Sequence, residues 1–162
     1  MYKALVIISS DSAYTGARED LSGPRARAML EENGYEVTDV LVLPDDHRMI
    51  ADALIGTCDR GEADLIVTSG GTGFAPRDVT PEATAEAVER MAPGIAEAIR
   101  AGSMKYTDRA MLSRGIAGIR KRTLIVNLPG SPKAVGEALG IILPAIGHGI
   151  AILKGEDGNC GR

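Results

Sequence analysis

Short apolar runs alternate with amphipathic segments along the first half of the chain. The runs 4–8, 37–43 and 65–67 are rich in Val, Ile and Leu, and a polar or glycine-containing segment follows each one. Between the first two runs, apolar residues recur at helical spacing until Asn33-Gly34, a pair typical of a helix C-cap. Continuous apolar strands that alternate with amphipathic helices are typical of a parallel sheet covered on both faces. The pattern therefore predicts an α/β protein, a three-layer α/β/α domain with a mostly parallel central sheet.

The second half of the chain continues this pattern, with prolines near the predicted helix starts. Thr80-Pro81 predicts a third helix with Thr80 as its N-cap, and Pro93 predicts a fourth. Residues 116–126 read as two short strands around a basic turn, and a long helix is predicted to follow from about Ser131. The alternation of strands and helices thus extends almost to the end of the sequence.

Length and composition favour one domain with an aliphatic core. A chain of 162 residues usually forms a single domain, and no repeat or linker divides residues 1–162. We expect residues 153–162 to form a flexible tail of this domain. Aromatic residues make up 3% of the chain and the formal net charge is -4, and both values argue against a nucleic-acid-binding surface.

The sequence predicts a soluble, cytoplasmic protein that does not enter a membrane. The longest apolar stretch, near 141–152, contains Pro144 and several glycines, which we expect to break it. The N-terminus lacks the pattern of a signal peptide. Cys58 and Cys160 lie far apart and match no metal-ligand spacing; we expect Cys58 to be buried and Cys160 to lie in a frayed tail.

Polar turns follow four of the predicted strands. Ligands of open α/β sheets bind beyond the carboxyl ends of the strands, so these turns should meet at one site. Each turn is short and polar, as a binding site requires. The turns are Ser9-Ser10-Asp11-Ser12, Pro44-Asp45-Asp46, Ser69-Gly70-Gly71-Thr72-Gly73 and Asn127-Leu128-Pro129-Gly130-Ser131.

The glycine turn 69–73 can bind an anion, because backbone N–H groups converge where side chains are missing. Glycine turns also occur simply to reverse the chain, and that structural interpretation stays open. The turn is not a Walker A loop, since no Lys-Ser or Lys-Thr pair follows the glycines. Pro76 stands where the dinucleotide fingerprint needs its third glycine, which argues against a dinucleotide-dependent oxidoreductase.

Asp45 and Asp78 are candidate metal ligands at this edge of the sheet. Mg²⁺ favours one or two carboxylates together with substrate phosphates. Each acid also has a structural interpretation: Asp78 precedes a helix whose dipole favours a negative charge, and Asp46 is expected to cap the helix after Asp45. Asp11 is either a third acid of the site or an Asx turn that closes the first strand.

Basic residues near the last strands allow both interpretations as well. Ser131, followed by proline, is the expected N-cap of the long helix, yet a helix N-terminus also receives anions, and Lys133 would add charge there. The basic residues 120–122 are most simply a solvated hairpin turn. The function of the Ser-Arg-Gly segment 113–115 stays open.

Taken together, these segments resemble the molybdopterin adenylyltransferase family, with its MogA/MoaB-like fold. The resemblance covers residues 3–152, and the order and spacing of its motifs are intact. It rests on SSDSAYTGAREDLSGP (9–24), LPDD (43–46), TSGGTGFAPRDVTPEAT (68–84) and SRGIAGIRKRTLIVNLPGSPKAV (113–135).

The resemblance implies an enzyme of molybdenum cofactor biosynthesis that transfers AMP from ATP to the terminal phosphate of molybdopterin, with Mg²⁺, and releases pyrophosphate. It implies Asp45 and Asp78 as catalytic acids and metal ligands. It also implies a homotrimer and a possible hand-over of the product to a molybdenum-insertion protein. The binding residues that it implies are Asp11, Ser12, Ser69, Gly70, Gly71, Thr72, Gly73, Ser113, Asn127, Pro129, Gly130, Ser131 and Lys133.

A non-catalytic molybdopterin-binding or scaffold module of the same fold is the alternative, because a fold does not determine a function. The presence of both Asp45 and Asp78 favours the enzyme. Transfer between phosphates depends on positioning and charge compensation, and the chain offers backbone donors and acids but no evident Ser/His or Cys/His pair for it.

Overall fold

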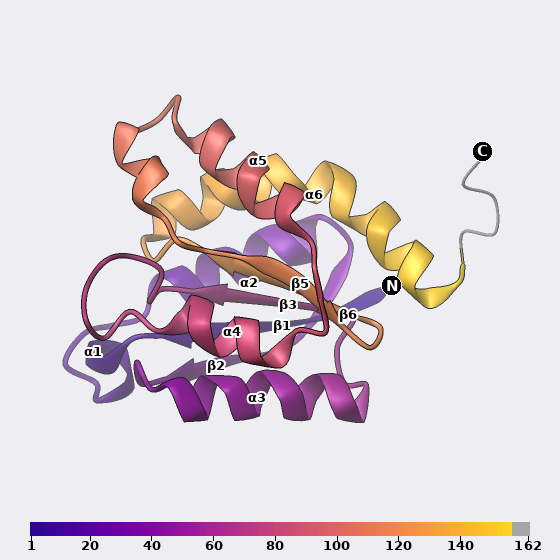
Figure 1. Cartoon of the computed structure of the whole chain (residues 1–162), viewed down its shortest axis with the longest axis horizontal. Helices are drawn as coiled ribbons and strands as arrows, with labels where there is room; N and C mark the ends of the chain where they lie inside the picture. Colours follow the sequence, from indigo (N-terminus) through magenta and orange to yellow (C-terminus); the bar gives the residue numbers. More distant parts are fainter. Residues whose placement is uncertain (157–162) are drawn as a thin grey trace.

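A six-stranded sheet forms the centre of the computed structural model, which describes residues 1–156 (Figure 1). The strand order is β2-β1-β3-β6-β5-β4. The first four strands of this order are parallel; β5 is antiparallel to β6, and β4 at the edge is antiparallel to β5. The strands are β1 (Tyr2–Ser9), β2 (Tyr35–Leu43), β3 (Leu65–Ser69), β4 (Arg90–Met91), β5 (Ala117–Arg120) and β6 (Thr123–Leu128).

Helices cover both faces of the sheet, as the sequence predicts. Helices α2, α5 and α6 pack on one face, and α3 and α4 pack on the other (Figure 1). Two short helical segments, α1 and the 3₁₀ helix η1, lie at one end of the molecule. The helices are α1 (Asp11–Tyr14), α2 (Ser22–Glu32), α3 (His47–Arg60), α4 (Thr80–Ala87), α5 (Pro93–Ser103), η1 (Asp108–Leu112) and α6 (Pro132–Lys154).

The central strands are apolar throughout because each contributes to two cores. In β1, Val6 and Ile8 contact the α2/α5/α6 side, whereas Leu5 and Ile7 contact the α3/α4 side. Side chains of a strand alternate between faces, so a strand covered on both faces needs an uninterrupted apolar run. The fold class predicted from that pattern is confirmed.

Helix α6 differs from what the sequence predicts for the apolar stretch near 141–152. It continues through Pro144, so the predicted break in this apolar stretch is wrong. A helix can keep its course at a proline when packing outweighs one lost hydrogen bond, and α6 buries Leu139, Ile142 and Ile146 around that position. Among residues 1–156 it is the one helix long and apolar enough to span a membrane, a property that core helices of soluble proteins share.

The first part of the C-terminal tail expected over 153–162 is helical. Leu153 and Lys154 still belong to α6, and Gly155 ends the helix in the left-handed conformation. The remainder of the expected tail from 157 onward, which includes Cys160, lies outside the described residues.

Two predicted helix caps are confirmed and one is wrong. Asp46 accepts a hydrogen bond from Met49 N at 2.8 Å, and Ser131 accepts one from Ala134 N at 3.1 Å. Thr80 is not a cap, because Val79 occupies the N-cap position of α4 without a side-chain hydrogen bond. Thr80 instead lies in the first turn, and its backbone N donates to Gly71 O at 3.1 Å. A backbone carbonyl of the glycine turn therefore accepts one of the free N–H groups at the start of α4.

Candidate active site

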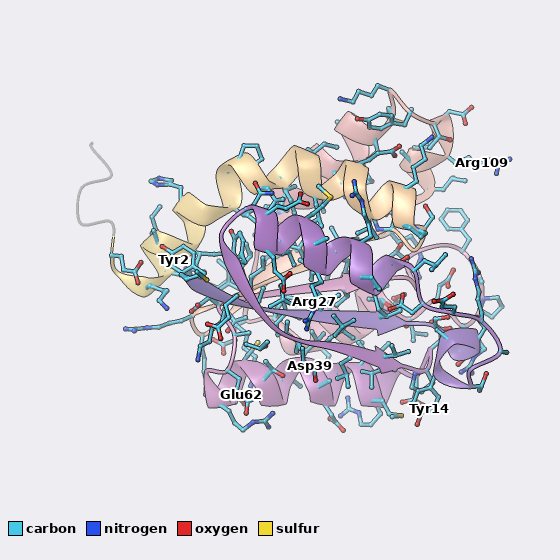
Figure 2. All side chains as sticks on the ribbon, turned by 180° about the vertical axis from the view of Figure 1, so that it is seen from behind. Tyr2, Tyr14, Arg27, Asp39, Glu62 and Arg109 are labelled. Carbon is cyan, nitrogen blue, oxygen red and sulfur yellow. The ribbon has the colours of Figure 1, made fainter. Side chains whose placement is uncertain are left out.

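The four polar turns meet at one end of the sheet. Ile8 is paired with Ser69, and Ser69 with Leu128, so β1, β3 and β6 end level with one another. In Figure 2 the parallel strands point toward the end that carries Tyr14 and Arg109, whereas Tyr2 and Glu62 lie toward the other. We call the first of these the site end and the second the opposite end. The predicted convergence of the turns is confirmed.

Gly70 and Gly71 fit the glycine turn where no other residue would. Their φ angles are +95° and +66°, in the left-handed region. A Cβ atom on Gly70 would lie 2.3 Å from Ser9 O, and one on Gly71 would lie 2.3 Å from Thr80 Oγ1. Backbone conformation and close approach therefore both require glycine here.

Thr80 completes this turn from beneath. Its side chain is fully buried, and its Oγ1 has no hydrogen-bond partner among the described residues. A buried hydroxyl without a partner costs about 1–3 kcal/mol of stability. Such a cost is typical of functional sites, where the group is kept for something other than stability.

Asp45 and Asp11 hold each other at the ends of β2 and β1. Asp45 accepts hydrogen bonds from Ser9 Oγ at 2.7 Å and from Asp11 N at 2.9 Å, and Asp45 N donates to Asp11 Oδ1 at 3.0 Å. The Arg77 guanidinium donates to both carboxylate oxygens of Asp11 and holds the pKa of Asp11 below its usual value. Asp11 is thus an ion-pair partner, and Asp45 is fixed beside Ser9.

Asp78 lies on the other flank of the glycine turn. Its Oδ2 accepts a hydrogen bond from Ala75 N at 3.0 Å and lies 2.8 Å from the place where a Cβ on Gly73 would be. On the Asp45 side, Ser9 Oγ lies 3.2 Å from the equivalent place on Gly71. The two candidate acids therefore flank the same three-residue turn and are not on opposite sides of the molecule.

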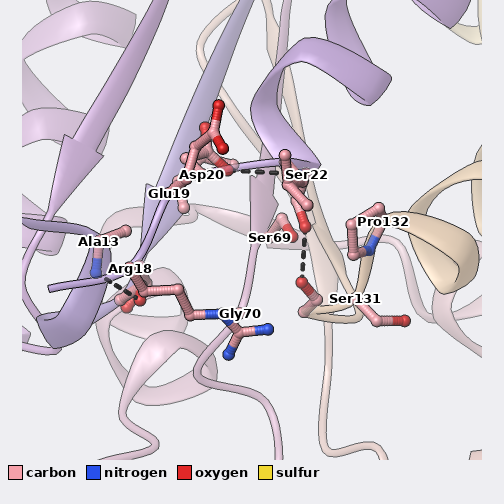
Figure 3. Close-up of a pocket in the computed structure, with 14 residues that line it drawn as sticks. Ala13, Arg18, Glu19, Asp20, Ser22, Ser69, Gly70, Ser131 and Pro132 are labelled. Carbon is pink, nitrogen blue, oxygen red and sulfur yellow. Dashed lines mark hydrogen bonds between the residues drawn. The ribbon is translucent and has the colours of Figure 1, made fainter. Parts of the chain in front are cut away.

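A first cavity of about 360 Å³, here the serine cavity, opens between the ends of β1 and β3 and the starts of α2 and α6. Figure 3 shows Arg18 reaching across it toward Gly70. Two serines shape its wall: Ser22 Oγ donates to Gly130 O at 2.7 Å, and Ser69 Oγ donates to Pro129 O at 2.8 Å. This cavity exposes several serines and lies at the N-terminus of the longest helix.

A second cavity of about 510 Å³, here the η1 cavity, is lined by residues 70–74, Asp78, Ser113 and part of η1. Gly70 and Gly130 line both cavities. A Cβ on Gly130 would lie 3.4 Å from Gly70 Cα, so these two backbone segments are in close contact. The arrangement can hold two ligands on either side of a thin backbone partition.

Five predicted site residues line neither cavity: Asp11 and Asp45, which are hydrogen-bonded to each other, and Asn127, Ser12 and Lys133. Asn127 is buried: its Oδ1 accepts from Ile116 N at 3.1 Å, and its Nδ2 donates to Thr68 and Thr84. Ser12 Oγ lies 3.2 Å from Ser10 Oγ, within the first turn. Lys133 is 85% exposed and lies 3.9 Å from a carboxylate on its own helix. Their assignment as ligand contacts stays a prediction.

Sequence reasoning missed several residues that the structure brings to this end. Ser9 holds Asp45, Arg77 holds Asp11, and Arg114 holds the loop around Asp78. Arg18 and Ser22 line the serine cavity. All five lie within the quoted motif segments, but no local pattern distinguishes an arginine that fixes a loop from one on a solvated surface.

Asp45 and Asp78 could each offer a carboxylate to a cation whose other ligands are substrate phosphates and water. No group of three or more His, Cys, Asp or Glu side chains within residues 1–156 could hold a metal ion. Asp45 and Asp78 supply two carboxylates, with the hydroxyl oxygens of Ser9 and Thr80 near the same turn. Two carboxylates plus phosphate oxygens and water form a set that Mg²⁺ favours.

The chain is similar to proteins of molybdenum cofactor biosynthesis. The family described as "Probable molybdopterin binding domain" matches residues 5–148. A molybdopterin adenylyltransferase of Helicobacter pylori is 42% identical over 153 residues, which cover 93% of this chain and 87% of that protein. The molybdenum cofactor synthesis protein cinnamon of Drosophila melanogaster is 42% identical over 94% of this chain, which corresponds to 25% of its own length.

Solved structures agree with these sequence relatives. The molybdopterin biosynthesis enzyme MoaB of Thermus thermophilus superposes with a TM-score of 0.90 at 43% identity, covering 96% of this chain and 98% of that one. The tungsten cofactor synthesizing protein MoaB of Pyrococcus furiosus superposes with a TM-score of 0.84 at 34% identity, covering 96% of both chains.

Proposed function

This chain belongs to the molybdopterin-binding family, and we propose that it is a molybdopterin adenylyltransferase. In this proposal ATP and molybdopterin are the substrates, Mg²⁺ assists, and adenylylated molybdopterin and pyrophosphate are the products. The observation that carries it is the pair of cavities on either side of Gly70 and Gly130, with acids at both flanks of the adjoining turn. A transfer between two large anions needs two adjoining pockets that position the substrates, together with groups that compensate their charge.

The proposed reaction forms one bond and breaks one. An oxygen of the terminal phosphate of molybdopterin attacks the α-phosphorus of ATP, and the bond from that phosphorus to the α–β bridging oxygen breaks. Pyrophosphate leaves with the bonding electron pair. In this proposal the backbone amides of residues 71–73 bind phosphate oxygens, and Arg18 offsets negative charge at the serine cavity.

Asp45 and Asp78 are the proposed ligands for Mg²⁺, which when bound neutralises phosphate charge. Ser9 keeps the Asp45 carboxylate in place, and the hydrogen bond from Ala75 N orients Asp78. Arg77 already compensates the charge of Asp11, so the proposal assigns the metal to Asp45 and Asp78 and not to Asp11.

Release of pyrophosphate tests this proposal directly. Purified protein is incubated with ATP, Mg²⁺ and molybdopterin, and pyrophosphate is measured over time. We expect production that requires all three additions, and omission of molybdopterin is the matched control. Binding of molybdopterin without any pyrophosphate would contradict the enzyme and support a non-catalytic scaffold.

We also propose that the chain forms a homotrimer, works in the cytoplasm and hands its product to a molybdenum-insertion protein. The assembly is supported by an apolar groove of about 680 Å³ between β5, α5 and α6, lined in part by Ile95, Ile119, Ile146 and Ile152. Light scattering should give three times the chain mass, and a monomer at micromolar concentration would contradict the trimer. Fractionation of cells carrying a tagged chain, and capture with a candidate insertion protein, test the other two.

A further inference from the structure

Arg114 fastens the loop that carries Asp78. Its Nε donates to Gly73 O at 2.7 Å and its Nη2 donates to Asp78 O at 2.7 Å, while Nη1 donates to the Glu82 carboxylate. Its own backbone N donates to Thr72 O at 2.8 Å. One residue therefore ties together the glycine turn, the backbone of Asp78 and the first turn of α4.

The backbone on both sides of Arg114 is itself held by a second arginine. Arg100, on α5, donates from Nη1 to Gly115 O at 2.6 Å and to Ser113 O at 3.3 Å. The contacts run from a helix on one face of the sheet, through residues 113–115, to the loop at the rim. A planar guanidinium donates in several fixed directions at once, which suits three acceptors on different segments.

We propose that Arg114 is a positioning residue for adenylyl transfer, which acts by fixing Asp78 and the glycine turn and not by touching substrate. This inference rests on the proposed function, in which Asp78 is one of the two acids. Asp78 lies in a loop, and a loop without this anchor samples many conformations. A displacement of about 1 Å in a catalytic group can lower the rate about a hundredfold.

Arg120 provides a matched control at the opposite end of the sheet. It donates to both carboxylate oxygens of Asp59, at 2.8 and 2.9 Å, and to Ala87 O at 3.0 Å. Like Arg114, it joins a carboxylate to a backbone carbonyl of a different segment. It lies far from Asp78, at the amino ends of the parallel strands, so it measures the structural loss of such an arginine alone.

The test compares Arg114→Ala and Arg120→Ala in steady-state adenylyl transfer. We expect Arg114→Ala to lower kcat about a hundredfold while the KM for ATP changes less than about threefold. Arg120→Ala should lower stability but leave kcat within about threefold of the parent. A kcat of Arg114→Ala close to that of the parent would overturn the inference.

A double-mutant cycle separates positioning from a general loss of structure. If Arg114 acts through Asp78, Arg114→Ala should lower kcat by less than about threefold in the Asp78→Asn background. A further loss close to the full hundredfold would contradict the inference. Full turnover of Asp78→Asn alone would instead contradict the proposed role of Asp78.

Two further measurements test whether Arg114 holds the loop, and the first of them does not depend on the reaction. Hydrogen exchange at residues 72–79 should be faster in Arg114→Ala than in Arg120→Ala, and equal rates would show that Arg114 does not hold the loop. Millimolar guanidinium should restore part of the activity of Arg114→Ala, whereas Arg114→Lys should stay impaired because one ammonium cannot reach three acceptors. Full activity of Arg114→Lys would contradict this geometry.

Discussion

At the site end of the sheet the glycines at positive φ are crowded and the buried Thr80 hydroxyl has no described partner, whereas at the opposite end Gly61 is uncrowded and the buried Thr123 hydroxyl is hydrogen-bonded. There Arg120 binds Asp59, Lys154 lies 2.8 Å from Asp64, and Thr123 Oγ1 donates to Ala63 O at 2.7 Å. Neither end is needed to complete the core, which lies between them. The difference indicates that the opposite end is arranged for stability and the site end for a ligand.

Breaking this comparison at its chemical centre should give the largest effect. Asp78→Asn should lower adenylyl transfer at least a hundredfold, about 2.7 kcal/mol in the barrier, with little change in folding. The matched change at the opposite end, Asp59→Asn, should leave turnover near that of the parent. Turnover of Asp78→Asn equal to that of the parent would remove this acid from the mechanism.

Two glycines with the same φ of +66° sharpen the comparison. A Cβ on Gly71 would lie only 2.3 Å from Thr80 Oγ1, whereas a Cβ on Gly61 would meet nothing within 4 Å. Gly61→Ala should therefore lower the free energy of unfolding by about 1 kcal/mol, from backbone strain alone. Gly71→Ala should lower it by about 2 kcal/mol more, because atoms must also move apart.

Urea unfolding of both glycine variants measures this difference. Equal losses of stability would mean that the site-end turn relaxes freely and is not the tight cradle described above. Gly71→Ala should also lose adenylyl transfer, whereas Gly61→Ala should retain it, since Gly61 only ends α3.

Two buried threonines should respond to valine with opposite signs. Thr80→Val removes a hydroxyl that has no described partner and should raise the free energy of unfolding by about 1 kcal/mol. Thr123→Val removes a hydrogen bond to Ala63 O and should lower it by a similar amount, about 1 kcal/mol. Thermal unfolding distinguishes the two, and destabilisation by Thr80→Val would mean that its hydroxyl is satisfied.

The smallest effect should be a pH dependence of the free energy of unfolding that comes from Asp59 at the opposite end. Hydrogen bonding to Arg120 lowers the pKa of Asp59 to about 2. The resulting stability is therefore present above the ordinary pKa of 3.8 and is lost as the pH falls from there toward 2. Arg120→Ala should show a shallower loss of stability over that range.

The exposed pair of Arg27 and Glu31, at 3.9 Å, supplies the control for this titration. Arg27→Ala should keep the acid dependence of the parent, because exposed pairs of this kind contribute little to stability. An unchanged slope in Arg120→Ala would show that the low pKa of Asp59 has another cause.

The sequence predicted most of the fold because the signals for it are local and repeated. Apolar runs and helix ends marked the principal strands and helices. Segments as short as α1 (Asp11–Tyr14) and β4 (Arg90–Met91) were missed, since so few residues show no periodicity. Thr80 was misassigned as a cap because a threonine before proline is a typical capping pattern. The packing of Gly71 against Thr80 depends on the fold of the turn, which this local pattern does not show.

The candidate site was predictable in its turns and not in its supports. Asp45 and Asp78 were predicted as site acids because acids after strands carry a chemical meaning, and that role stays a prediction. Arg77 and Arg114 were not assigned, because their partners are 66 and 36 residues away. Asn127 was predicted to contact the ligand, and only the fold reveals that its amide is used up between β3, α4 and the segment before β5.

The contact between Gly70 and Gly130 has a consequence for how the two substrates would react. A partition of bare main chain is as thin as a protein can build, so ligands in the two cavities could meet past its edge, where the reacting atoms must come within about 3.5 Å of each other. The same narrowness leaves little room for bulk solvent to compete for an activated nucleotide.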